Sequence, residues 1–178
     1  MKSLIFIITA LLLAVIPVAA QEDAVPRFEP ADCPFDADGS VECGFVVVPE
    51  FHAQPDGDTI RLSVVIQRGS DPDAAPVILL SGGPGEKTTE NAEFALFGGF
   101  STLADDTRDF IVFDQRGVGL SEPALECPEY AETMLAWLER EPDPEASAQA
   151  VYDALLACRV RLAAEGIDFA AYNTLENA

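Results

Sequence analysis

The chain has 178 residues, about the length of one domain and too short for two large ones. Hydrophobic residues make up 49% of the sequence, which excludes a chain that is wholly a disordered polar tail. Ten lysines and arginines stand against 31 aspartates and glutamates, a formal charge of -21. Because so acidic a surface repels phosphate groups, we expect neither nucleic-acid binding nor docking on an anionic membrane.

The N-terminus predicts a secretory signal peptide over residues 1–20. Lys2 supplies the positive charge, residues 4–16 are an apolar run, and residues 17–20 end in the small side chains that a signal peptidase reads. The alternative is an uncleaved anchor, but the apolar run is shorter than the ~20 residues that span a bilayer. We therefore expect residues 21–178 to be secreted or otherwise extracytoplasmic, without a stable membrane span.

Four cysteines in an exported chain are expected to form disulfides. Three pairings are possible. We predict that Cys33 pairs with Cys43, around a turn-like stretch, and that Cys127 pairs with Cys158, around helical sequence, because each bond then closes one local unit. A metal site is the alternative. The spacing lacks a CxxC motif and the single histidine, His52, has no evident partner, so we expect no metal.

The first half of the predicted domain contains an antiparallel strand pair. Residues 21–42 are rich in Pro, Asp and Gly and are expected to be irregular. Residues 43–49 form an apolar run, and residues 60–67 alternate apolar and polar side chains with a period of two, so both are predicted strands. Turn residues at 54–58 join them.

The pattern then changes to that of a βαβ unit. Residues 77–80 are a continuous apolar run that ends in a glycine-rich turn at 81–85, and residues 110–113 are a second buried strand. The stretch 89–103 between them is predicted to be helical, although two glycines at 98–99 weaken its second half. Strand, helix and strand in this order indicate a mostly parallel sheet.

Two further helices are predicted, and their apolar residues are assigned to core packing. The first covers residues 128–140. The second begins at Asp143, a capping residue followed by proline, and stops at Gly166. Thr174 is interpreted as the N-cap of another helix. Because a newly capped helix does not finish by Ala178, we expect the chain to be the front portion of a longer protein.

The glycine-rich turn at 81–85 is the first candidate site. Glycines let the backbone approach a ligand, and its N–H groups can point at developing negative charge. A phosphate-binding loop is disfavoured because Glu86 stands where a glycine should precede Lys87. An oxyanion hole of an α/β-hydrolase and a turn without a ligand both stay open from this loop alone.

The second candidate motif, residues 114–121, follows the next buried strand. Asp114 and Arg116 are expected to pair and brace a loop beside the site, and glycines such as Gly117 allow its sharp turn. Ser121 lacks the second glycine of the GxSxG nucleophile turn, so we interpret it as a loop serine.

Together, GGPG at 82–85 and DQRGVGLS at 114–121 resemble the prolyl and tripeptidyl aminopeptidases, serine exopeptidases of the α/β-hydrolase fold. The resemblance covers about residues 33–178 and is greatest to the exported tripeptidyl-aminopeptidase-like branch. Two departures are Ser81, where the family often has histidine, and Glu86, where it often has glycine.

The resemblance implies roles for individual residues. A backbone N–H of Gly83, with Gly82 as its neighbour, would help to hold the oxyanion. Asp114, Arg116 and Gly117 would form a structural loop near the site.

The resemblance also implies an α/β fold. The chain would be the N-terminal part of an α/β-hydrolase domain and would end before the nucleophile strand, which is expected beside residues 77–80. It implies acyl transfer through a Ser–His–Asp triad on peptides with a free N-terminus, without a cofactor. No GxSxG is present, so the triad is expected beyond Ala178 and the chain alone should be inactive. His52 is interpreted as an exposed loop residue. An esterase of the same fold, a non-catalytic secreted protein and an inactive truncated product stay open as alternatives, and no oligomeric state is predicted.

Overall fold

The computed structural model of the chain describes residues 25–83, 85–99, 106–140 and 143–177. The predicted signal peptide, residues 1–20, lies outside the described residues, as does its cleavage site. Within the described part, no helix combines the length and the apolar character that a membrane crossing requires.

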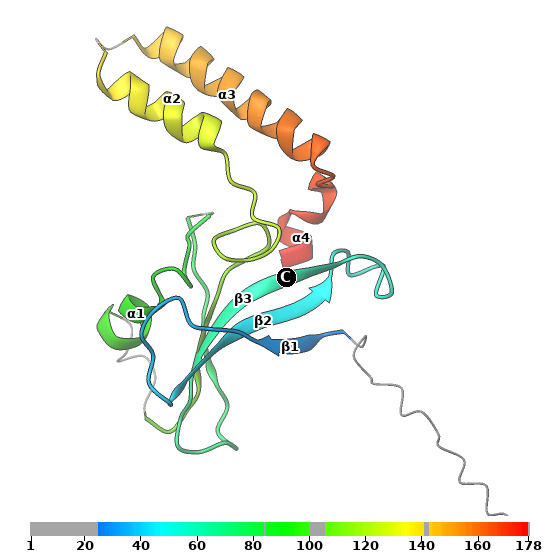
Figure 1. Cartoon of the computed structure of the whole chain (residues 1–178), viewed down its shortest axis with the longest axis vertical. Helices are drawn as coiled ribbons and strands as arrows, with labels where there is room; N and C mark the ends of the chain where they lie inside the picture. Colours follow the sequence, from blue (N-terminus) through cyan, green and yellow to red (C-terminus); the bar gives the residue numbers. More distant parts are fainter. Residues whose placement is uncertain (1–24, 84, 100–105, 141–142, 178) are drawn as a thin grey trace, which may run out of the picture.

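Five strands form one mixed sheet in the order β1-β2-β3-β5-β4 (Figure 1). The first three strands are antiparallel to one another, β5 is antiparallel to β3, and β4 is parallel to β5. The strands are β1 (Arg27–Pro30), β2 (Val41–Pro49), β3 (Thr59–Gln67), β4 (Val77–Leu79) and β5 (Phe110–Phe113). The chain is therefore α/β in class, and four of its strands are those that the sequence predicts, with small shifts at their ends.

Strand β1 lies within residues 21–42, which the sequence predicted to be irregular, and that part of the prediction is wrong. Its residues gain strand structure by pairing with β2, where Phe28 lies opposite Val46. The pairing also needs a residue without a side chain at position 44 of β2, because a Cβ at Gly44 would lie 2.7 Å from the Phe28 ring. A strand made by such contacts has little local signal, since β-propensity depends on neighbours across the sheet.

Between β4 and β5 the chain forms α1 (Ala92–Phe94), which continues as the π-helical segment η1 (Ala95–Gly99). The helix predicted over residues 89–103 is thus much shorter within the described part, and residues 100–105 lie outside it. This segment and one face of the sheet enclose the main core. The core residues are Cys43, Val65, Ala92, Ala95, Leu96, Phe110 and Val112.

Helices α2 (Pro128–Leu138) and α3 (Pro144–Ala164) form a hairpin that projects from the sheet (Figure 1). The start of α3 is as predicted, because the Asp143 side chain accepts a hydrogen bond from the Ala146 N–H at 3.1 Å. Gly166 follows its end with a φ of 96°. Helix α2 buries none of its residues, and Leu138 is 79% exposed, so its assignment to core packing is wrong for the described part of the chain.

Both predicted disulfides are present. Cys33–Cys43 joins the segment after β1 to β2, and Cys127–Cys158 joins the start of α2 to α3. The second bond crosses the base of the helical hairpin, where Cys158 is almost fully buried. A crosslink at this point restricts the hairpin where packing alone gives α2 little support.

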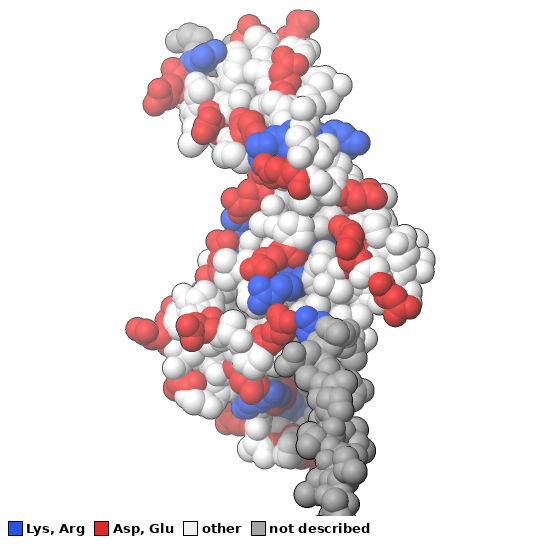
Figure 2. All heavy atoms as spheres, turned by 45° about the vertical axis from the view of Figure 1, so that its right-hand side comes forward, with Lys and Arg blue, Asp and Glu red and all other residues white. Residues whose placement is uncertain are grey.

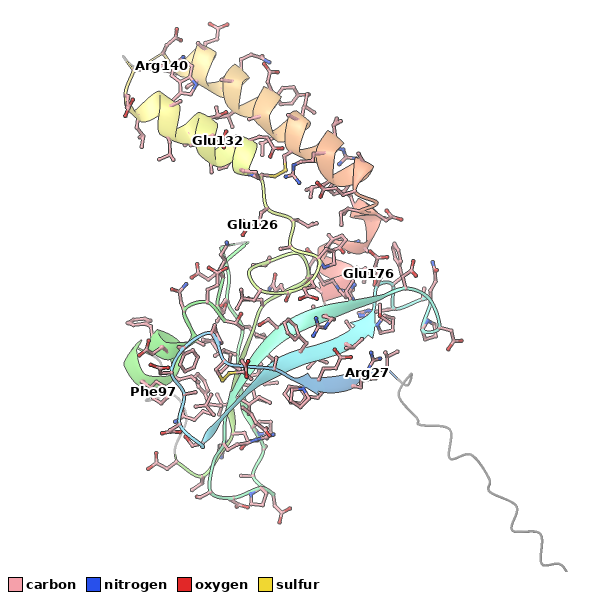
Figure 3. The ribbon with its side chains drawn as sticks, viewed as in Figure 1. Arg27, Phe97, Glu126, Glu132, Arg140 and Glu176 are labelled. Atoms are coloured by element: carbon pink, nitrogen blue, oxygen red, sulfur yellow. A yellow bond between two sulfur atoms is a disulfide. The ribbon has the colours of Figure 1, made fainter. Side chains whose placement is uncertain are left out.

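After α3, the chain returns to the sheet through the 3-10 turn η3 (Phe169–Ala171) and α4 (Thr174–Asn177). The predicted cap at Thr174 is wrong by one position. The Asn173 side chain accepts hydrogen bonds from the N–H groups of Leu175 (2.8 Å) and Glu176 (3.1 Å), so Asn173 caps this helix. In Figure 3, Glu176 lies beside the end of the β2–β3 hairpin, far from the tip of the helical hairpin.

Candidate functional site

The glycine-rich loop follows β4 at the carboxyl end of the parallel pair β4–β5, the kind of edge where α/β sheets bind ligands. Gly83 and Gly85 have φ angles of 94° and 97°, which favour glycine. Within the described part of the chain, no acceptor binds the backbone N–H of Gly82 or Gly83. Both N–H groups are therefore available to an oxygen that develops negative charge.

A cavity of about 380 Å³ opens beside this loop. Its walls are largely apolar, with Gly82 and four polar side chains among them. The apolar residues are Leu79, Leu80, Phe94 and Ala95, and the polar side chains belong to Ser81, Glu86, Thr88 and Asn91. Hydrogen-bond donors beside a mostly apolar space are the usual features of a small-molecule or peptide site.

Three hydrogen bonds hold the base of the loop. The hydroxyl group of Thr88 donates to that of Ser81 at 2.7 Å, which joins the two ends of the turn. The Gln115 side-chain amide donates to the carbonyl oxygen of Ser81 at 3.5 Å, and that of Asn91 donates to the carbonyl oxygen of Lys87 at 3.0 Å. The loop is thereby fixed to the segments after β5 and before α1.

Asp114 holds the segment after the glycine-rich loop in place. Its carboxylate is fully buried and accepts hydrogen bonds from the N–H of Thr89 (3.0 Å), the N–H of Leu120 (2.9 Å) and the hydroxyl group of Thr89. A buried carboxylate is tolerated when several donors satisfy its oxygens. Asp114 thus joins the end of β5 to the segment that leads from the glycine-rich loop into α1.

The expected pairing of Asp114 with Arg116 is wrong. The Arg116 guanidinium donates to the carbonyl oxygens of Pro49 (3.2 Å) and Glu50, and lies 3.3 Å from His52 Nε2. Asp114 is satisfied by hydroxyl and amide donors, whereas Arg116 binds the carbonyl groups at the end of β2. Two neighbouring charged residues therefore brace opposite sides of their loop.

The turn that follows Arg116 depends on glycine. Gly117 has a φ of 73°, and a Cβ there would lie 2.7 Å from the side chain of Leu125. Gly117 therefore allows a close approach of the chain as well as the turn itself.

Ser121 has a structural role in the described part of the chain. Its buried hydroxyl group donates to the Asp114 carbonyl oxygen (3.0 Å) and accepts the N–H of Ser63 (2.9 Å). The Ser63 hydroxyl group in turn donates to that of Thr89 at 3.0 Å. A serine held in this way has no free hydroxyl group for attack on a substrate, in agreement with its interpretation as a loop serine.

His52 lies on the loop after β2 with its side chain 53% exposed, as expected, but it does have partners. Its backbone N–H donates to Glu176 at 2.9 Å, its Nδ1 lies 3.7 Å from the same carboxylate, and its Nε2 faces Arg116. These contacts attach α4 to the sheet. None of the described contacts of His52 is with the glycine-rich loop, whose described partners are Gln115 and Thr88.

Of the two charged residues directly after the loop, Lys87 has ion-pair partners among the described residues and Glu86 has none. Lys87 lies between two carboxylates, Glu90 at 3.3 Å and Glu126 in a closer contact, and the hydrogen bond to Glu126 raises the pKa of Lys87. Glu86 makes no ion pair or hydrogen bond within the described residues.

Figure 2 shows acidic side chains spread over the sheet and the helical hairpin on the visible face, so the negative charge is not concentrated at this loop. No cluster of metal-binding side chains occurs in the described ranges.

Thr89 was missed by the sequence analysis, although it is fully buried and binds Asp114 through both its N–H and its hydroxyl group. The available signal was a pair of threonines separated by two residues from a glycine-rich turn, a position where hydroxyl groups commonly satisfy free backbone groups. That signal does not identify the partner of Thr89, because Asp114 lies 25 residues further along the chain.

No family model matches the chain. Proteins named serine protease Hip1, from Mycobacterium tuberculosis and Mycobacterium bovis, are 34% identical to it over 92 residues. The match covers 50% of this chain and only 17% of each relative. The chain is thus related to a serine protease over half of its length, and it spans a small part of the curated relatives that it matches.

Proposed function

We propose that this chain is the front part of an exported serine peptidase of the α/β-hydrolase class, and that the whole protein is an aminopeptidase. In this proposal the glycine-rich loop is an oxyanion hole, with the N–H of Gly83 as the main donor and Gly82 beside it. The observation that carries the proposal is that the N–H groups of Gly82 and Gly83, after the carboxyl end of β4, have no acceptor among the described residues, and that Gly82 lines the cavity. The relation to a serine protease supports it.

The arrangement of the sheet supports the same proposal. Strand β4 is the last strand on its side of the described sheet, and Ile78 is 52% exposed there. The proposed nucleophile strand would pair with this edge. Two disulfides agree with an extracytoplasmic location, because such bonds persist in oxidising surroundings.

The proposed mechanism is acyl transfer. A serine whose proton passes to a histidine attacks the peptide carbonyl carbon, and the N–H of Gly83 stabilises the negative charge that forms on the carbonyl oxygen. The histidine then gives the proton to the amine that leaves as the C–N bond breaks, and water hydrolyses the acyl-serine ester to release the N-terminal product and restore the serine. The serine, the histidine and their aspartate would be supplied by sequence beyond the described residues. Asp114, Gln115 and Thr88 would keep the loop rigid, so the N–H groups need not reorient during the reaction.

The first experiment is to sequence the gene beyond codon 178. We expect an open reading frame that yields a strand ending in GxSxG within about 50 residues, followed by an aspartate and a histidine. The full-length product should hydrolyse aminoacyl p-nitroanilides, and a fluorophosphonate should inhibit it. An N-acetylated anilide should resist hydrolysis.

Two results would overturn the proposal. A stop codon directly after codon 178 would remove the catalytic role from this product. A full-length protein that cleaves simple esters but no anilide would exclude the aminopeptidase and favour an esterase of the same fold.

A further inference from the structure

A second hollow, of about 300 Å³, lies between the glycine-rich loop, the turn after β5 and the base of the helical hairpin. We call it the hairpin-base hollow. None of its lining residues belongs to β4, so the nucleophile strand proposed at the β4 edge would not use this lining. The loop, the turn and the hairpin base contribute Gly85, Val118, Gly119, Leu125, Pro128 and Ala131.

The walls of the hairpin-base hollow are held in place at the base of the hairpin. The disulfide Cys127–Cys158 joins the two helices there. The Arg161 guanidinium donates to the carbonyl oxygen of Glu126 at 2.7 Å, and Figure 3 shows Glu126 on the linker between the sheet and α2. The hollow is therefore formed before a ligand arrives, and little binding free energy is lost to ordering of the protein.

The charges at this hollow cancel. Lys87 and Glu126 are its charged lining residues, and their side chains pair with each other. The other lining residues are glycines, apolar side chains and the disulfide-bonded Cys127. A charged ligand group would lose its water here without gaining a counter-ion, so the lining favours an uncharged, apolar side chain.

The turn after β5 also offers a backbone donor to the hollow. The N–H of Gly119 has no acceptor among the described residues, whereas the next N–H, that of Leu120, binds Asp114. An extended peptide that crosses the turn presents carbonyl oxygens to such a donor. The lining therefore combines an apolar surface with a donor for a peptide backbone.

The hairpin-base hollow is open at its rim, where Gly85, Glu126 and Ala131 are exposed. The N-terminal end of an aminopeptidase substrate stops inside the site, whereas the part after the cleaved bond continues into solvent. An open hollow beside the loop therefore suits the part of the substrate that leaves.

We propose that the hairpin-base hollow binds an uncharged, apolar side chain of the peptide on the leaving side of the cleaved bond, with the Gly119 N–H bound to its backbone. This inference rests on the proposed function, which it deepens by assigning a specificity subsite. Gly85 lines the hollow and follows the proposed oxyanion donor Gly83 closely in the loop. A carbonyl group held at Gly83 thus brings the next residue of the substrate to the hollow.

The first test uses the full-length product and three peptides that differ only in the residue after the cleaved bond, which is Leu, Asp or Lys. Each begins with the acyl group of the anilide that the enzyme cleaves best and ends in a glycinamide. We expect kcat/KM for the Leu peptide to exceed that for both others by about tenfold or more. Weak cleavage of the Asp peptide alone would indicate repulsion by the acidic chain and would overturn the inference, as would equal cleavage of all three.

The second test fills the hollow. Ala131→Phe, at an exposed position of α2, should lower kcat/KM for the Leu peptide about tenfold through KM. It should leave hydrolysis of the corresponding simple amide unchanged, because that substrate releases only ammonia. The matched control, Ala136→Phe, lies on the same helix, exposed and outside the lining, and should change neither. An equal loss with both substrates, or no loss with the peptide, would overturn the inference.

A third measurement does not need catalysis. N-acetyl-photoleucyl-glycinamide, which carries a diazirine in its side chain, should crosslink on irradiation to residues 117–131 of the full-length product, as mapped by mass spectrometry. Ala131→Phe should reduce this labelling at least about fivefold, and Ala136→Phe should not. Labelling without any hydrolysis would refute the peptidase and not the hollow, whereas hydrolysis without labelling at these residues would refute only the hollow.

Discussion

The carboxylate of Asp114 binds both the backbone N–H and the hydroxyl group of Thr89, and none of these groups is exposed to solvent. This relationship connects the end of β5 with the segment that leaves the glycine-rich loop. It fixes one end of the loop without a cation, since hydroxyl and amide donors satisfy the charge. The loop's support is therefore a network of short polar side chains rather than a salt bridge.

Asp114→Asn should destabilise the fold. The new amide group keeps only one acceptor oxygen, so its N–H₂ group would face the N–H of either Thr89 or Leu120 and leave that donor unsatisfied. We expect a loss of about 2–4 kcal/mol in the free energy of unfolding, measured by urea denaturation. Asp56→Asn, on an exposed turn, is the control and should stay within about 0.5 kcal/mol of the parent. Equal stability of the two variants would show that Asp114 does not anchor the loop.

Three glycine-to-alanine variants separate steric overlap from backbone strain. Gly119 has a φ of 56° and a Cβ there would overlap the Asp114 carboxylate, so Gly119→Ala should cost about 2 kcal/mol or more. Gly166 has a φ of 96° with open space around it, and should cost about 1 kcal/mol through strain alone. Gly39, with neither feature, should cost little. Thermal unfolding measures all three, and any other order would contradict this account.

Gly83→Ala tests the proposed oxyanion loop in the full-length product. The φ of 94° is unfavourable for alanine, so the loop should relax and turn its N–H away from the oxyanion. We expect kcat for an aminoacyl anilide to fall by about 10- to 100-fold, within the range for loss of an oxyanion donor, with little change in KM. Gly39→Ala again serves as the control. A Gly83→Ala enzyme with parental kcat would exclude this N–H from the reaction.

Tyr172 makes the fold sensitive to alkaline pH. Burial, with further contributions from Glu50, raises the pKa of Tyr172 to about 12. A phenol with a higher pKa in the folded state favours folding while it is protonated, so this stabilisation is complete below pH ~10 and is lost as the pH rises toward 12. We expect the fold to lose on the order of 1–2 kcal/mol across that interval.

The measurement for Tyr172 is urea denaturation at several pH values between 9 and about 12. Tyr172→Phe should lose less stability than the parent over this interval, since it has no phenol to ionise. Tyr152→Phe, on the exposed face of α3, should behave as the parent does. A parent and a Tyr172→Phe variant with identical pH profiles would contradict the assignment.

The disulfide Cys127–Cys158 should stabilise the helical hairpin against local unfolding. Because α2 buries no residue, replacing both cysteines with serine should loosen the hairpin, so that the backbone at the exposed Arg140, at its tip in Figure 3, unfolds locally and fits the active site of trypsin more often. We expect tryptic cleavage after Arg140 to be at least about fivefold faster than in the parent. The control, Cys33→Ser with Cys43→Ser, removes the other bond and should leave cleavage at Arg140 unchanged. Equal rates in the two double variants would show that packing, not the crosslink, holds α2.

The sequence alone determined the elements that depend on local pattern. The alternation in residues 60–67 predicted β3, the apolar runs that end in glycine-rich loops predicted β4 and β5, and the Asp143 cap predicted the start of α3. The two disulfides also followed from spacing. Each of these features is specified by residues close together in the chain, where periodicity, capping and short loops act.

The tertiary structure decided the features that depend on distant partners. Strand β1 exists because β2 pairs with it and Gly44 leaves room for Phe28. Asp114 binds Thr89 rather than Arg116, and α4 docks on His52 through Glu176, 124 residues away. A charged side chain binds whichever partner the fold brings within hydrogen-bond distance, and that choice is not present in the local sequence.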